Sequence, residues 1–193
     1  MEGATFVFEL IEEGGFSAVD NAFENLPRSS EQILHTEKYF DSEKPIELDV
    51  PDDAMGVGWS VLAESVLGEF FLKTWLEALR SDRACAALAG WGGDSYAVFE
   101  DEAGETPLGV VIAWDSDADA REFFLVASDA LDAHKDFTIA SSGLPEVLES
   151  WQGPGGYVVM SRWKSVDHCD LVAIGITPTG GGSYGLVFAL AEG

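Results

Sequence analysis

The sequence has few basic residues, few cysteines and no long apolar run. Its 193 residues include only 10 Lys and Arg against 35 Asp and Glu, a formal charge of -25 at pH 7. A surface of that sign repels phosphates, so we expect no nucleic-acid partner. A spanning helix needs about 18 apolar residues and a secretory leader needs a basic start. Neither pattern is found, so we expect no membrane insertion and a cytoplasmic location.

The remaining absences limit the chemistry. Cys85 and Cys169 are too few and too far apart for a disulfide scaffold or a paired-cysteine metal site. No HExxH motif, nucleophile elbow or phosphate-binding glycine loop is present. The histidines, His35, His134 and His168, are isolated in sequence. Adjacent side chains of a strand point to opposite faces, so His168 and Cys169 fit ordinary sheet positions. We therefore expect no metal, no cofactor and no catalytic residue on this chain.

The acidity has two interpretations, a halophilic protein or an ordinary acidic one. In 1 M salt, charge repulsion is screened within about 3 Å, whereas at low salt it opposes the compact state. The halophilic interpretation predicts that the melting temperature rises with added NaCl. A melting temperature that stays flat from low to molar salt would exclude it.

A hydrophobic fraction of 47% and an aromatic fraction of 11% indicate a folded domain. Up to about residue 90 the apolar spacing is mostly helical. It predicts helices over residues 6–11 and 16–23, a helix capped near Ser29–Ser30, a long buried helix over 60–79 with a Glu69–Lys73 pair, and a short one over 84–89. Residues 45–51 alternate between two prolines and predict an edge strand. The run Gly90–Asp94 predicts a tight connection with Trp91 as a buried anchor.

After residue 95 the pattern changes to strands. It predicts a hairpin of 96–100 and 110–114, a helix over 117–134 capped by Ser116, and strands over 157–163, 171–176 and 184–190. Segregated helices and strands predict a single α+β domain over residues 1–193. It has a helical N-terminal half, 1–90, and an antiparallel sheet of five or six strands with a covering helix in 95–193. A sub-boundary falls near 90–95.

Three stretches stand in a distinctive order: 6–39 (FVFELIEEGGFSAVDNAFENLPRSSEQILHTEKY), 56–79 with its Leu67-Gly68-Glu69, and 87–99 (ALAGWGGDSYAVF). They resemble the C-terminal part of a zincin-like (HExxH) metallopeptidase family of bacteria and haloarchaea. The resemblance spans roughly residues 3–125. In that family the HExxH helix precedes these stretches, and it is absent here. Members carry Arg after G-W-G-G-D, where this chain has Ser95.

The resemblance implies a set of residues that line a cleft: Ser30, Glu31, Gln32, His35, Glu69, Trp91 and Asp94. Each also has a structural interpretation, as a helix cap, an ion-pair partner or a core anchor. We expect a non-catalytic domain that acts by binding or regulation, with a separate HExxH-bearing chain or a second copy of this chain as candidate partners. The alternative is a hydrolase with an unconventional carboxylate and His site near Glu31, His35 and Asp94.

Overall fold

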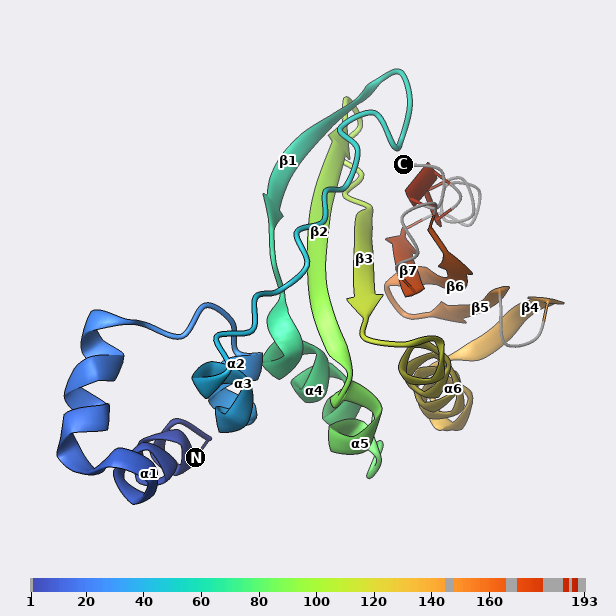
Figure 1. The fold of residues 1–193 in the computed structure, drawn as a ribbon. Helices are drawn as coiled ribbons and strands as arrows, with labels where there is room; N and C mark the ends of the chain where they lie inside the picture. Colours follow the sequence, from blue (N-terminus) through green and yellow to red (C-terminus); the bar gives the residue numbers. More distant parts are fainter. Residues whose placement is uncertain (1, 145–147, 166–169, 179–185, 188, 191–193) are drawn as a thin grey trace.

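The structure is a computed structural model that describes residues 2–144, 148–165, 170–178, 186–187 and 189–190. Figure 1 shows a curved sheet with helices at one side and an N-terminal helical projection. The elements, in chain order, are α1 (Glu2–Glu24), α2 (Glu31–Leu34), α3 (Thr36–Phe40), β1 (Trp59–Ser65), α4 (Gly68–Ala78), α5 (Ala84–Leu88), β2 (Trp91–Asp101), β3 (Leu108–Trp114), α6 (Asp117–Ala133), β4 (Thr138–Leu144), β5 (Leu148–Gly153), β6 (Gly156–Lys164) and β7 (Asp170–Thr177).

The seven described strands form one antiparallel sheet in the order β1-β2-β3-β7-β6-β5-β4. The predicted α+β class is confirmed, with more strands than the five or six expected. The central strands β3 and β7 are almost entirely buried, which explains their continuous apolar sequences, LGVVIAW and DLVAIGIT. Residues such as Ile112 and Val172 pack against α4, α5 and α6, whereas Val111 and Ala173 face the opposite core. The sheet is therefore covered on both faces.

Two further regions adjoin this sheet body, which we define as residues 59–177. The arm, residues 2–43, contains α1, α2 and α3, and α1 is kinked at Gly15, where φ is 65°. The strap, residues 44–58, runs along the sheet between α3 and β1 (Figure 1). Its apolar side chains, including Leu48 and Val50, join the core on the face opposite α6. The arm has a small core of its own, centred on buried Phe6, Leu10 and Ala22.

The long helix predicted over 60–79 is wrong in its first part. Residues 59–65 form the edge strand β1, and α4 begins only at Gly68. A bulge between Val61 and Ala63 interrupts the pairing with β2, and the strand is mostly exposed, so the period-two alternation of a half-buried strand is lost. Phe70 and Phe71, expected in the core, are half exposed.

Two predictions around the glycine run also need correction. The strap forms no strand over 45–51, where a single backbone bond, Ile46 N–H to the Gly92 carbonyl at 2.7 Å, joins it to β2. The run Gly90–Asp94 is no turn, since β2 begins at Trp91. The glycines admit the strap, because a Cβ on Gly93 would lie 2.2 Å from the Ile46 carbonyl oxygen. A close approach of two backbone segments therefore explains the glycine at position 93.

Other predicted elements are confirmed. The β2–β3 hairpin pairs as expected, and Ser116 caps α6, since its hydroxyl accepts the Asp119 N–H. Strands β6 and β7 lie within a residue or two of their predicted bounds. Strands β4 and β5 were not predicted. Of the strand expected over 184–190, the described residues 186–187 and 189–190 are helical and the others lie outside the described residues. No helix within the described ranges is long and apolar enough to cross a membrane.

Candidate functional site

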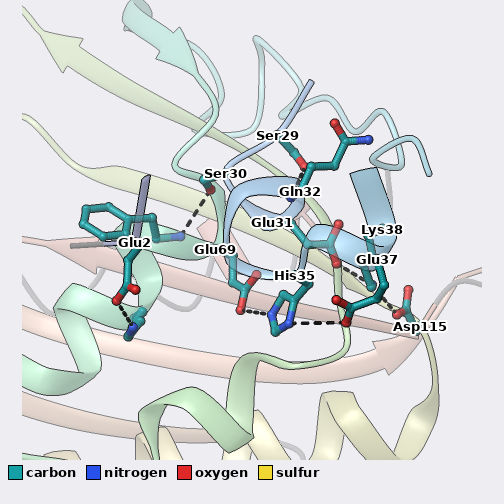
Figure 2. Close-up of polar contacts among 12 residues, drawn as sticks. Glu2, Ser29, Ser30, Glu31, Gln32, His35, Glu37, Lys38, Glu69 and Asp115 are labelled. Atoms are coloured by element: carbon teal, nitrogen blue, oxygen red, sulfur yellow. Dashed lines mark hydrogen bonds and ion pairs between the residues drawn. The ribbon is translucent and has the colours of Figure 1, made fainter. Parts of the chain in front are cut away.

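The seven predicted cleft residues gather where the arm meets the start of α4. Five of them, Glu31, Gln32, Glu69, Trp91 and Asp94, are at most 3% exposed. Figure 2 shows Ser30 and His35 directed toward residues of α4 and Glu31 directed toward Lys38. The polar atoms of these residues fall into four separate groups of contacts. The groups determine what the arrangement can do.

The first group caps α4 from outside the helix. The Leu67 and Gly68 N–H groups donate to the two Asp94 carboxylate oxygens at 2.6 and 2.8 Å, and the Phe70 N–H donates to Ser30 Oγ at 3.2 Å. The first N–H groups of a helix have no partner inside it, so these side chains supply the missing acceptors. Burial raises the pKa of Asp94, and the two backbone donors oppose that rise. Ser30 and Asp94 therefore anchor this helix to the arm and to β2.

Trp91 lies beside this cap and is buried in the main core, as predicted. Its indole Nε1 is buried and has no hydrogen-bond partner within the described part of the chain. The indole lowers the pKa of Asp94, ranking after the two backbone donors among the causes that lower it. Trp91 is thus an apolar anchor.

The second group is a hydrogen-bonded pair between the arm and α4. His35 Nε2 lies 2.9 Å from Glu69 Oε1, and the second oxygen of Glu69, Oε2, is buried without a hydrogen-bond partner among the described residues. The Glu37 carboxylate lies 4.0 Å from the other ring nitrogen. The hydrogen bond to Glu69 raises the pKa of His35, although burial opposes it. The predicted Glu69–Lys73 pair is wrong, because Lys73 bonds Glu2 of α1 at 2.8 Å.

The third group surrounds Lys38, which the sequence analysis missed. Lys38 Nζ lies 2.5 Å from Glu31 Oε1, 3.0 Å from Glu43 Oε1 and 3.1 Å from Asp115 Oδ2. Burial raises the pKa of Glu31 to about 7, and Lys38 opposes that rise. Burial alone would lower the pKa of Lys38, but its bonds to Glu31 and Glu43 outweigh burial and raise it. The three carboxylates lie close enough together to hold a cation, and the Lys38 ammonium fills that role.

The fourth group is centred on Gln32. Its Oε1 accepts the Arg28 N–H at 2.7 Å, and its Nε2 donates to the Glu43 carbonyl at 2.5 Å. This side chain therefore ties the segment before α2 to the segment after α3. A glutamine with both amide atoms bonded to backbone has a structural role.

Ser30, Trp91 and Asp94 border a hollow of about 570 Å³ beneath the strap, but His35 and Glu69 are not part of its lining. His134 ends α6, as predicted. His168 and Cys169 lie outside the described residues. Within the described chain, His35 and Glu69 are the candidate residues whose contact has acid–base geometry.

The fold and the site together define an α+β domain whose N-terminal arm is joined to a two-faced antiparallel sheet by buried polar side chains. Residues 60–166 match the family Domain of unknown function (DUF8575), and the chain belongs to that family. The match includes Glu69, Trp91 and Asp94, whereas Ser30, Glu31, Gln32 and His35 of the arm precede it. No curated protein and no solved structure matches the chain.

Proposed function

We propose that this chain is a non-catalytic domain that binds a partner protein through its arm. The observation that carries the proposal is the uneven distribution of exposed apolar side chains. In the described part of the chain, thirteen large apolar side chains are exposed, and all except Ile139 lie between Val7 and Phe71. Six of them belong to the arm, and the most exposed of these six are in α1. Phe16 and Phe23 of α1 are 76% and 78% exposed. Concentrated exposed apolar surface is typical of interaction sites.

The polar candidate residues support the non-catalytic half of the proposal. Asp94 and Ser30 use their side-chain oxygens to cap α4, Glu31 is bonded to Lys38, and Gln32 is bonded to backbone. Groups committed to such contacts are not available to a substrate. The alternative metal chemistry has a direct test, which is metal analysis of the purified protein. Stoichiometric zinc that is lost in His35→Ala would overturn the proposal.

The charge of α1 indicates the chemistry of the partner. The helix contains no Lys or Arg, and its carboxylates are Glu2, Glu9, Glu12, Glu13, Asp20 and Glu24. Asp20 lies four residues after Phe16 and three before Phe23, so the acidic and apolar groups share one face. A partner with an apolar surface flanked by Lys or Arg complements this face. The resemblance to zincin-like proteins makes a separate HExxH-bearing chain in the cytoplasm our candidate, and the charge of the arm disfavours a nucleic acid.

A synthetic amphipathic helix of Leu and Lys tests this surface by titration into the full chain. The double variant Phe16→Ser/Phe23→Ser keeps the charge, and we expect it to bind the peptide about tenfold more weakly than the unaltered chain. Ile139→Ser, an exposed apolar position in β4, is the matched control and should bind normally. Equal affinity in all three proteins would show that charge alone attracts the peptide. Dimers in sizing chromatography at high salt would instead favour a second copy as the partner.

The second candidate function, a hydrolase, depends on the His35–Glu69 contact alone. A buried carboxylate that orients a histidine is a known way to build a general base. A raised His35 pKa leaves a smaller fraction of the imidazole unprotonated near neutral pH, and no Ser or Cys side chain bonds His35 in the described chain. Hydrolysis of p-nitrophenyl acetate that is lost in both His35→Gln and Glu69→Gln, with the fold retained, would favour this candidate.

A further inference from the structure

The molecule has a second hollow, whose lining residues are distant in sequence from the arm. It lies between residues 79–83, which connect α4 to α5, and residues 126–135 at the end of α6, and its volume is about 580 Å³. That volume is in the range of small-molecule sites. Leu79, Val126, Ala130 and Ala133 contribute apolar lining. The hollow lies wholly within residues 60–166, the part of the chain that matches the family.

The charge of this hollow is opposite to that of the protein. Arg80, Arg83 and Lys135 line it together with two carboxylates, Asp82 and Asp129. The local excess is therefore one positive charge, in a chain whose net charge is -25. Cations gathered in a concave, partly apolar site favour anion binding locally, even where the distant field is negative.

Two of these cations have no carboxylate partner. Arg83 is held by Glu122 at 3.4 Å and by Asp129 at 3.9 Å. Arg80 and Lys135 make no ion pair with any residue that the structure describes. The chain has 35 carboxylates and only 10 Lys and Arg. Two of the cations without an ion pair in its described part, Arg80 and Lys135, line one hollow.

The backbone of Arg80 is the independent observation. The Ser81 N–H donates to the Leu76 carbonyl at 3.0 Å and the Arg80 N–H donates to the Glu77 carbonyl at 2.9 Å. This is the Schellman ending of α4, and Arg80 occupies its left-handed position with φ of 64°. Glycine is the usual residue there, because a side chain strains the left-handed backbone. Arg80 therefore has a strained backbone and lines the hollow. Strained backbone of this kind is often found at functional positions.

His134 adds a hydrogen-bond donor to the same lining. Its Nδ1 accepts the Asp136 N–H at 3.4 Å, so in the neutral imidazole the proton is on Nε2. Arg offers a planar fork of donors that suits a carboxylate or a phosphate, and Lys offers a point charge. We propose that this hollow binds a small organic anion, with a carboxylate or phosphate group on Arg80 and Lys135 and an apolar portion on the α6 side chains. The proposal goes beyond the arm surface and does not depend on it.

The decisive variant is Arg80→Gly, because the two roles of the residue predict opposite effects on stability and binding. Glycine relieves the strained backbone, so the melting temperature should rise, while the affinity for the anion should fall about tenfold or more. Lys44→Gln is the matched control, since Lys44 is an exposed cation of the strap without a described partner and its loss changes the net charge equally. Lys135→Gln should weaken binding without the gain in stability.

The probes are benzoate, phenyl phosphate and inorganic phosphate, each titrated at millimolar concentration into the full chain and followed by calorimetry. Tighter binding of phenyl phosphate than of benzoate would assign a phosphate ligand, and the reverse order would assign a carboxylate. Both aromatic probes should bind more tightly than inorganic phosphate, because only they contact the apolar lining. No saturable binding of any probe, unchanged affinity in Arg80→Gly, or an equal loss in Lys44→Gln would each overturn the proposal.

Discussion

The sheet body and the arm are built by different kinds of interaction. Two large apolar cores enclose the sheet, one beneath α4, α5 and α6 and the other beneath the strap. In the arm, only Phe6, Leu10 and Ala22 are buried apolar residues. The arm is attached to the body chiefly by polar links, which are Lys38–Asp115, His35–Glu69, Ser30 to the Phe70 N–H, and Glu2–Lys73. Apolar packing makes the body stable, whereas the attachment of the arm depends on charge and protonation.

The largest difference should appear when one aromatic ring is removed from each region. Trp91→Ala deletes a buried ring of the main core and should lower the free energy of unfolding by about 3–5 kcal/mol. Phe23→Ala removes a ring that is 78% exposed in the arm, so its effect should stay within about 0.5 kcal/mol. Urea denaturation of both variants measures the contrast. Equal losses would mean that the arm is packed as tightly as the body.

A smaller effect, confined to the arm, is expected for Lys38→Met. It leaves the buried Glu31 carboxylate without its cation and frees Asp115, at a cost of about 2 kcal/mol. Hydrogen exchange should accelerate in residues 31–43, while α6 and the central strands stay protected. Lys44→Met is the control, because Lys44 has no ion-pair partner among the described residues. Faster exchange throughout the sheet after Lys38→Met would contradict a separable arm.

The smallest effect is a pH dependence that only the arm should show. In the folded chain the pKa of Glu31 is about 7 against an ordinary 4.5, and the pKa of His35 is raised above 6.5. Both groups bind their protons more tightly when folded, so the stability they give is present at low pH. It is lost as pH rises, from 4.5 to about 7 for Glu31 and upward from 6.5 for His35.

Protection factors for residues 31–43 should therefore fall between about pH 5 and pH 8 at fixed ionic strength, with α6 as the internal reference. The Glu2 pKa is lowered by its bond to Lys73 and acts in the opposite sense, but below 4.5. The Asp94 pKa is raised above 3.8 and acts in the same sense as Glu31. His35→Gln should remove the upper part of the dependence. Protection that rises with pH would refute the assignment.

Prediction from sequence succeeded where short-range signals determine the structure. Ser116 before an apolar stripe predicts α6, and the acidic loop between two apolar runs predicts the β2–β3 hairpin. Strand β1 was missed because its bulge removes the alternation, and β4 and β5 because TIASSGL and LESWQG carry little apolar pattern. The candidate residues were found as a set, yet the role of Asp94 was not, because the N–H groups that it binds belong to Leu67 and Gly68, far away in sequence. Lys38 carries no motif, and no spacing rule connects it to Asp115.

The central place of β7 has a consequence for how the chain is made. Strands β1–β3 and β4–β6 are two meanders that can each pair locally, but only β7 joins them, through registers such as Ile112 with Val172. During synthesis the two meanders emerge before β7. Until β7 follows, the edges of β3 and β6 have no partner strand in this sheet. The pairing of β3 with β7 closes the long loop of residues 115–169, which is slow. Until then, the open strand edges can pair with other nascent chains. The seventh strand to be synthesised is thus the one that turns two separate meanders into a continuous sheet.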